Sequence, residues 1–187
     1  MKKILKTLAL VGLGYVAINI ALANTQAGGL LLQVAAQKNS GTLTELFVFL
    51  GADVDDKNAE GLTALHVAGF LGAEQAIDVL VLKGATVNAT DKDNRTPLHL
   101  AAYEGRTDAV KSLLRHGANI EAREKANGMT PLHLAVVKGS TDVVQALIDN
   151  NANVNALANN DVTPLLIANQ EKKIAVADLL ENNSAEE

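Results

Sequence analysis

The 187-residue sequence predicts an all-α solenoid in which helix–turn–helix units stack in a row. Two phrases that recur in phase carry this prediction. The first is Thr-Pro-Leu-His or a close variant, and it begins at Thr63, Thr96, Thr130 and Thr163. The second is Gly-Ala-x-Val-Asp or a close variant, and it begins at Gly51, Gly84, Gly117 and Asn151. Self-similarity at a nearly constant period, here about 33 residues, is typical of repeat architectures.

One repeat, residues 90–122, shows why each unit is helical. Thr96 is a good helix N-cap, and Pro97 suits the first helical position, where its missing N–H costs nothing. Gly105 ends this first helix. Apolar residues then recur at spacings of 3 and 4, which predicts a second, amphipathic helix, and Gly117 ends it in the left-handed conformation. Each unit has an apolar face that it cannot bury alone, so neighbouring units must stack.

The two ends of the repeat region depart from the pattern. Residues 24–56 lack the Thr-Pro-Leu-His phrase and hold an additional residue near Asn39, so they are expected to form an N-terminal capping repeat. Residues 157–187, in which Leu166 replaces the histidine, are expected to form a C-terminal capping repeat and polar tail. Full repeats then occupy residues 57–89, 90–122 and 123–156. We expect polar outer faces at both ends, which keep a short solenoid soluble.

The first residues predict export. Lys2, Lys3 and Lys6 precede an almost wholly apolar run that closes with a small-x-small site at Ala23, and this is the pattern of a secretory signal peptide over residues 1–23. The run, which starts at Thr7, is shorter than the roughly 20 residues that a spanning helix needs. An uncleaved signal anchor is the alternative. Both interpretations place the repeats across the membrane. We expect a periplasmic protein, with a secreted protein or an inner-membrane anchor facing the periplasm as alternatives.

Composition excludes several function classes. Without residues 1–23 the chain keeps 13 basic and 21 acidic side chains, a formal net charge of −8, and such a surface repels nucleic acid. Cysteine is absent, which excludes a disulfide framework and thiol chemistry. The sequence carries no nucleophile-elbow, zinc-protease, Walker or dinucleotide motif. We therefore expect no enzyme, no cofactor and no small-molecule substrate.

Two groups of titratable residues invite a metal hypothesis. Stacked repeats lie about 10 Å apart, whereas zinc ligands lie about 2 Å from the ion, so three histidines in register cannot share one metal. Asp53, Asp55 and Asp56 lack the glycine and distal glutamate of a calcium loop, so we expect a solvated loop. His116 is a separate case: it stands before a helix-ending glycine, where a cation would complement the helix dipole, and a pH-sensing role is the alternative. No metal site is predicted.

The Thr-Pro-Leu-His phrase with its regular period resembles the ankyrin repeat, and the resemblance covers residues 30–184. It implies that the histidine bridges the threonine hydroxyl and the backbone of the adjoining loop, which assigns a structural role to His66, His99 and His133. It also implies a protein partner of unknown identity, bound on a concave face built from loop tips and the exposed side of the first helices.

The resemblance places that concave face on nine residues of this chain. They are Leu62, Phe70 and Leu71 in the first full repeat, Arg95, Tyr103 and Glu104 in the second, and Met129, Val137 and Lys138 in the third. The apolar members would form one strip, with the three charged residues as its rim. Exposed apolar strips often mark binding sites, and aromatic residues often dominate their energetics. The alternative is that the apolar residues only pack against neighbouring repeats.

The sequence therefore predicts an exported, monomeric, non-catalytic module that binds a protein. One alternative is a secreted effector of a host-associated bacterium, which would bind a host protein. Another is a membrane-tethered scaffold, which requires the signal segment to remain uncleaved. An enzyme with an unfamiliar site would need a perturbed acid or histidine outside the repeated phrase, and the sequence offers none.

Overall fold

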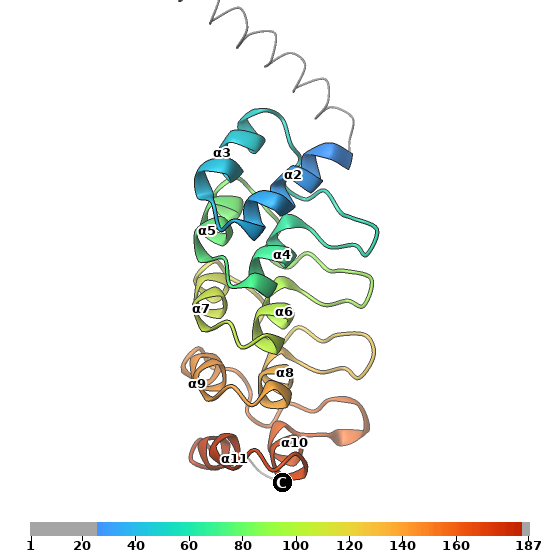
Figure 1. The fold of residues 1–187 in the computed structure, drawn as a ribbon. Coiled ribbons are helices and arrows are strands. Elements are labelled where there is room, and N and C mark those ends of the chain that lie inside the picture. The colour runs from blue at the N-terminus through green and yellow to red at the C-terminus, as the bar shows by residue number, and fades with distance from the viewer. Residues whose placement is uncertain (1–25, 185–187) are drawn as a thin grey trace, which may run out of the picture.

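A computed structural model describes residues 26–184, so the predicted signal segment and the last three residues of the polar tail lie outside the described range. Residues 26–184 form ten α-helices and one single-turn 3-10 helix, with no strand. The helices stack as antiparallel pairs in one row (Figure 1). The prediction of an all-α solenoid is confirmed.

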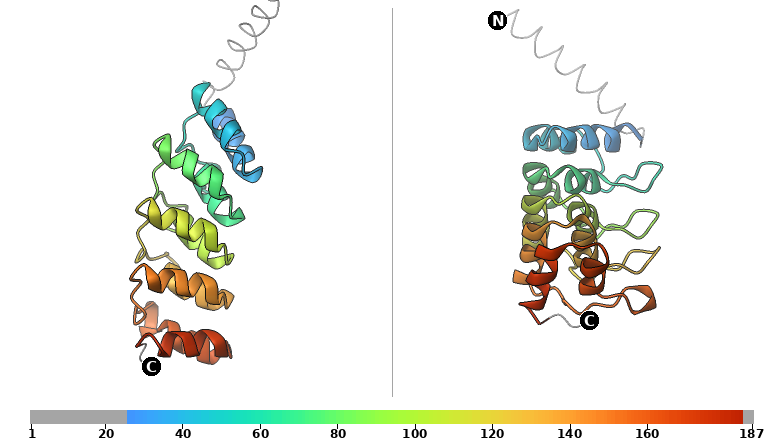
Figure 2. Two further views of the ribbon diagram at one scale, coloured as in Figure 1. Left: turned by 90° about the vertical axis from the view of Figure 1, so that its left-hand side faces the viewer. Right: turned by 60° about the horizontal axis from the view of Figure 1, so that its bottom comes forward.

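Each pair consists of an inner and an outer helix. The inner helices are α2 (Gln26–Gln37), α4 (Ala64–Leu71), α6 (Pro97–Tyr103), α8 (Pro131–Lys138) and α10 (Pro164–Gln170). The outer helices are α3 (Gly41–Phe49), α5 (Glu74–Leu82), α7 (Thr107–Arg115), α9 (Thr141–Asp149) and α11 (Ile174–Glu181). Four hairpin loops, residues 56–62, 89–95, 122–129 and 156–162, precede the inner helices from α4 onward. The last of them contains the 3-10 helix η1 (Asn159–Asp161). All four loops project to one side of the stack (Figure 2, right).

The inner helices begin and end as the repeated phrase predicts. Thr63, Thr96 and Thr130 each form a reciprocal capping box with the histidine three positions later. The turn after an inner helix needs a left-handed residue, and the first pair uses Asn39 there, with φ of 45°. Asparagine tolerates this conformation. The interval from Asn39 to Gly72 equals that from Thr63 to Thr96, so the expected additional residue is absent from the first pair.

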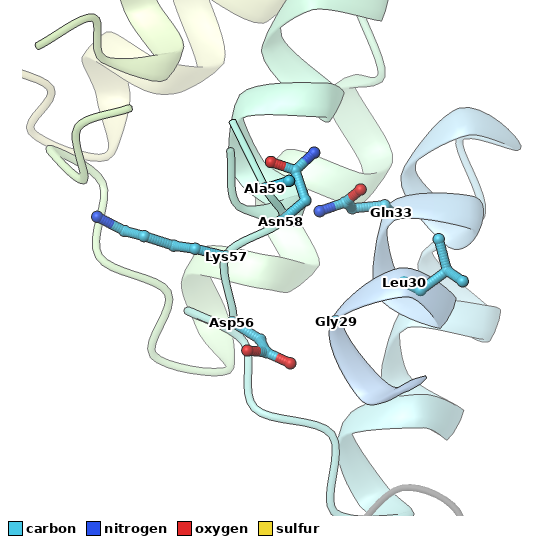
Figure 3. Close-up of a pocket in the computed structure, with 7 residues that line it drawn as sticks. All are labelled: Gly29, Leu30, Gln33, Asp56, Lys57, Asn58 and Ala59. Carbon is cyan, nitrogen blue, oxygen red and sulfur yellow. The ribbon is translucent and has the colours of Figure 1, made fainter. Parts of the chain in front are cut away.

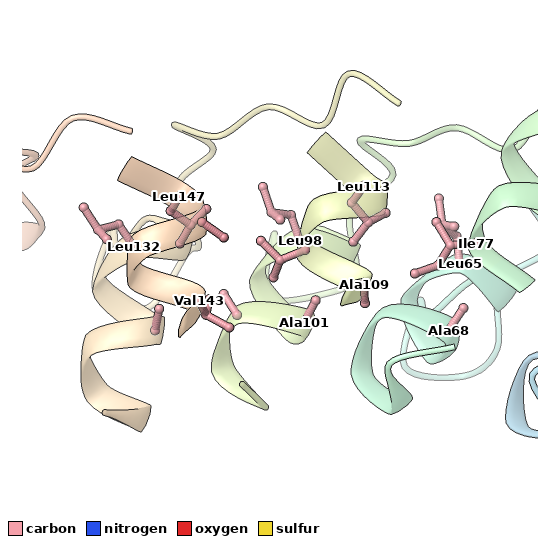
Figure 4. Close-up of a cluster of buried hydrophobic side chains, with 14 of the residues drawn as sticks. Leu65, Ala68, Ile77, Leu98, Ala101, Ala109, Leu113, Leu132, Val143 and Leu147 are labelled. Carbon is pink, nitrogen blue, oxygen red and sulfur yellow. The ribbon is translucent and has the colours of Figure 1, made fainter. Parts of the chain in front are cut away.

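Small and branched apolar side chains fill the space between consecutive pairs. Figure 4 shows Leu65, Leu98 and Leu132 of the inner helices beside Ile77, Leu113 and Leu147 of the outer helices, and all of them are buried. Burying one such side chain contributes about 1.5–3 kcal/mol. Because each pair contacts only its neighbours in the row, the core is one continuous layer that depends on stacking.

Backbone hydrogen bonds join the tips of the hairpin loops along the row. The N–H of Lys92 donates to the carbonyl oxygen of Glu60 at 3.3 Å, Lys125 N–H to Asp93 at 2.8 Å, and Asn159 N–H to Asn127 at 2.7 Å. The loops are therefore held at a fixed spacing beside the inner helices.

The two ends of the stack differ in polarity. The C-terminal pair exposes Gln170, Asp178 and Glu181 together with the apolar Ile174, so its surface is mixed but carries charge. The N-terminal pair instead exposes Leu30 and Leu46, so the expected polar outer face is wrong at this end. These leucines are exposed because no repeat precedes α2 within the described residues. None of the helices in residues 26–184 is long and apolar enough to cross a membrane.

Candidate functional site

The three histidines of the repeated phrase connect each repeat to the next hairpin loop. His66 Nδ1 accepts the backbone N–H of Thr63 at 3.1 Å, so the proton is on Nε2, which donates to the carbonyl oxygen of Arg95 at 3.0 Å. His99 makes the same bond to Met129 at 3.2 Å, and His133 makes it to Val162 at 3.1 Å. The structural role implied by the resemblance is confirmed.

Burial keeps these histidines neutral. Desolvation lowers the pKa of His66, His99 and His133, and the hydrogen bond of each Nε2 to a carbonyl oxygen only partly opposes it. Both ring nitrogens of each histidine are already hydrogen-bonded. Across residues 26–184 no three His, Cys, Asp or Glu side chains are grouped so that they could hold a metal ion.

Gln33 occupies the histidine position of the first pair, which sequence reasoning missed. It is buried, and its Nε2 donates to the carbonyl oxygen of Leu62 at 3.1 Å. The signal was its position, one repeat length before His66. A glutamine amide can replace the histidine here because the bond needs only one N–H donor.

The acidic cluster after α3 is not simply a solvated loop. The carboxylate of Asp55 accepts hydrogen bonds from the N–H of Thr86 at 2.9 Å and from its hydroxyl at 2.6 Å. One repeat further, Asn88 Oδ1 accepts from the N–H of Asn119 at 2.7 Å. The last residue of the second repeated phrase therefore connects consecutive repeats in the segment between an outer helix and the next hairpin loop.

His116 also makes a contact between repeats. Its Nε2 lies 2.9 Å from the carboxylate of Asp78 on α5, which also accepts the Ser112 hydroxyl at 2.6 Å. Burial would raise the pKa of Asp78, but the hydrogen bonds from Ser112 and His116 and the charge of Arg115 outweigh it and lower that pKa. The cluster connects α5 to α7 on the outer side of the stack.

The predicted strip is exposed at its centre. Phe70, Leu71 and Tyr103 are exposed by 42%, 39% and 47%. Phe70 and Tyr103 occupy the same position on the adjacent inner helices α4 and α6. The other apolar members, Leu62, Met129 and Val137, are half-buried. Met129 and Val137 pack against the core. For these two residues, the alternative that they only pack against neighbouring repeats is therefore partly correct.

The predicted rim consists of ion pairs. Arg95 Nε lies 2.8 Å from the carboxylate of Asp91, and its Nη2 lies 3.2 Å from that of Asp93, which fixes the guanidinium within its own hairpin loop. Lys138 on α8 lies 3.9 Å from the carboxylate of Glu104, which follows α6. Because their charges are already paired, these residues would contribute to specificity more than to affinity.

A hollow of about 410 Å³ lies beside the first hairpin loop, outside the predicted residues. Its wall is formed by the start of α2 and by the hairpin loop (Figure 3), and it is lined by Gly29, Leu30, Gln33, Asp56, Lys57, Asn58 and Ala59. In the later repeats, each hairpin loop forms a backbone hydrogen bond with the hairpin loop of the repeat before it. The first hairpin loop has no such neighbour within the described residues, because residues 26–29 are part of helix α2. Across residues 26–184, the hollow thus lies where each later repeat has the preceding hairpin loop.

A comparison of the sequence with protein families gives a match that agrees with this geometry of helix pairs, capping histidines and paired loops. The model described as ankyrin repeats (3 copies) matches residues 32–124 and 120–186. The chain belongs to the ankyrin-repeat family. Ankyrin repeats are protein–protein interaction modules that are generally without catalytic activity, so this ankyrin-repeat protein is expected to have a protein partner. A comparison with curated proteins found no match.

Proposed function

We propose that this ankyrin-repeat protein is a non-catalytic module that binds a partner protein through the concave face formed by its inner helices and hairpin loops. The observation that carries the proposal is the pair of exposed aromatic residues, Phe70 and Tyr103, at one position of two adjacent helices. Leu71 extends this apolar centre, and the half-buried Leu62, Met129 and Val137 continue it at its edges.

Rigidity supports this assignment. The row of backbone bonds between hairpin loops fixes one wall of the face, and Arg106 Nε, 3.2 Å from the carbonyl oxygen of Phe70, connects the end of α4 to the next repeat. A partner would therefore meet aromatic residues on a backbone that is already held in place, which lowers the entropy that association costs. The ion pairs of Arg95 and of Glu104 with Lys138 would form the polar rim.

The proposal places this binding outside the cytoplasm. It is supported by the lysine-led apolar segment at the start of the sequence, and the periplasm is the expected compartment. A secreted effector and a membrane-tethered scaffold are the alternatives. Fractionation of cells and medium, followed by the intact mass of the purified protein, would distinguish the three locations.

The test of the concave face is affinity capture from the periplasmic fraction with matched variants. The Phe70→Asp, Tyr103→Asp double variant places charge on the proposed centre. Leu82→Asp is the control, because Leu82 is 77% exposed on the outer helix α5. We expect a partner that is held by the wild type and the control and lost in the double variant, with similar melting curves for all three. A partner retained by the double variant would place the site elsewhere.

A further inference from the structure

The first helix pair presents an apolar surface at the N-terminal end of the stack. Leu30 and Val34 on α2 and Leu46 on α3 are exposed by 62%, 37% and 46%. Leu31, Leu43 and Phe47 are half-buried around them. We call these six residues the end face. Figure 1 shows α2 and α3 as the first pair of the row.

The next pair shows which way the end face is directed. The equivalent residues one repeat further on are covered by the first pair and are buried or half-buried, and they are Thr63, Ala64, Val67, Ala76, Val79 and Leu80. The end face therefore points away from the stack along its axis. It is an exposed apolar surface whose equivalent in the next pair is covered by a neighbouring layer.

Charge distinguishes this end from the other. Residues 26–50 contain only two charged side chains, Lys38 and Glu45, and neither belongs to the end face. Glu45 is directed toward the second pair, 4.0 Å from Lys83. Residues 164–181 at the opposite end contain five charged side chains beside the exposed Ile174. Copies stacked head to tail would therefore place apolar side chains against charges, which is unfavourable.

The sequence immediately before α2 identifies what lies near the end face. The apolar run ends at Ala23, and only residues 24 and 25 separate it from Gln26, the first residue of α2. Even fully extended, this linker spans about 10 Å between Ala23 and Gln26. Leu30 and Leu31 lie in the first turns of α2. A bilayer that held the apolar run would therefore lie close to the end face.

We propose that the end face lies on the surface of the lipid bilayer in which a retained segment 7–23 is inserted. Leucine, valine and phenylalanine side chains on this face would enter the interfacial region, and this second attachment would supplement a short apolar segment. The stack then projects from the membrane with its axis away from the bilayer, and the concave face stays accessible along its side. This inference rests on the export of the repeats and on the membrane-tethered alternative within the proposed function, because it requires segment 7–23 to be retained, but it does not depend on the identity of the partner.

The absence of cysteine allows a direct test. Single variants Leu46→Cys and Val34→Cys place a polarity-sensitive fluorophore on the end face, and Ile174→Cys, at a position exposed by 72% on α11, is the control at the other end. Each labelled full-length protein is reconstituted in vesicles of zwitterionic lipid, because the protein itself is acidic. Melting curves of the labelled variants confirm that they fold.

We expect a blue-shifted emission at positions 34 and 46 that is quenched by a lipid-borne quencher, and a water-like, unquenched emission at position 174. Three results would overturn the proposal. The first is an intact mass showing that residues 1–23 are removed in the cell. The second is a water-like emission at all three positions. The third is a blue shift at positions 34 and 46 without lipid quenching, which would assign the end face to a second copy or to the segment itself. Failure of the partner capture with intact lipid quenching would count against the proposed function alone.

Discussion

The side-chain amide of Gln33 donates to the carbonyl oxygen of Leu62 at 3.1 Å, just as His66 Nε2 donates to that of Arg95 at 3.0 Å in the next repeat. The row of such bonds ends where Leu166 replaces the histidine, and no further hairpin loop follows α10 within the described residues. A donor is thus present wherever an inner helix faces a following hairpin loop. The N–H···O=C bond to the next hairpin loop is kept, although glutamine replaces histidine in the first pair.

This relationship predicts how substitutions at Gln33 affect stability. Gln33→Leu keeps the size of the side chain but removes one of the two hydrogen bonds to the carbonyl oxygen of Leu62, which still accepts the N–H of Asn58 at 3.0 Å, and losing one such bond costs about 0.5–1.5 kcal/mol. Gln33→His restores an Nε2 donor at the same position, so its free energy of unfolding should be close to that of the wild type. Urea denaturation measures both. A Gln33→Leu variant as stable as the wild type would show that water replaces the bond without cost.

The buried histidines predict a loss of stability in mild acid. Burial lowers the pKa of His66, His99 and His133 below the ordinary value of 6.5, so the unfolded chain binds protons more readily than the folded chain. The stability that these residues contribute is complete above pH 6.5 and is lost as the pH falls from there toward their folded pKa values. The measurement is the free energy of unfolding at about pH 7.5 and about pH 5.5.

A triple histidine-to-glutamine variant serves as the control for this pH dependence. Glutamine keeps the donor to the next loop, as Gln33 shows, but has no proton to gain. Its stability should change less between the two pH values than that of the wild type. The carboxyls of Asp78 and Glu124, whose pKa values are lowered from 3.8 and 4.5, release their contribution only in stronger acid. Equal pH dependence of the two proteins would exclude the histidines as its cause.

Glu124 accounts for the longer step between Thr96 and Thr130. Its Oε2 accepts the N–H of Ala126 at 2.6 Å, and its Oε1 accepts those of Asn127 at 2.6 Å and Met129 at 3.2 Å. In the shorter loop before it, Asp91 Oδ1 accepts the N–H groups of Asp93 and Arg95. The hairpin loop 122–129, which is one residue longer than the loop 89–95, therefore has a glutamate where the shorter loop has an aspartate.

Glu124→Asp should therefore destabilise the protein although the charge is kept, because the shorter carboxylate cannot reach all three N–H groups. Glu124→Ala should cost more, about 1–3 kcal/mol. The exposed neighbour Lys125→Ala is the control and should change the free energy of unfolding little. Thermal melts of the three variants measure the order, and equal stability of Glu124→Asp and wild type would contradict this account of the loop.

Sequence reasoning found the features that depend on residues close together in the chain. The capping boxes follow from a threonine and a histidine three positions apart, and left-handed turns follow from glycine or asparagine at one phase of the repeat. The contact between Asp78 and His116 was missed because its partners lie 38 residues apart and no equivalent residue pair recurs in the other repeats. Exposure of the predicted binding residues needed the structure, since the same helix position is aromatic and exposed at Tyr103 but half-buried at Val137.

The distance between Phe70 and Tyr103 depends on Gly69, and this predicts a variant that affects stability and binding together. A Cβ added at Gly69 would lie 2.7 Å from the carbonyl oxygen of Pro97, so α4 and α6 must move apart to accept it. Alanine gains about 1 kcal/mol in helix propensity over glycine, but overpacking against a backbone typically costs about 1–3 kcal/mol. We therefore expect Gly69→Ala to be destabilised.

Gly41→Ala is the matched control for this variant, because Gly41 also lies in a helix. Its added methyl group would lie 3.0 Å from Cγ2 of Val79, a side-chain atom rather than a backbone carbonyl, so its stability should stay close to that of the wild type. Displacement of α4 by Gly69→Ala would also change the spacing of the two aromatic side chains, and the captured partner should bind this variant more weakly than it binds Gly41→Ala. If Gly69→Ala melted above the wild type, the contact between α4 and α6 would be looser than the structure shows, and its role in spacing the aromatic pair would be wrong.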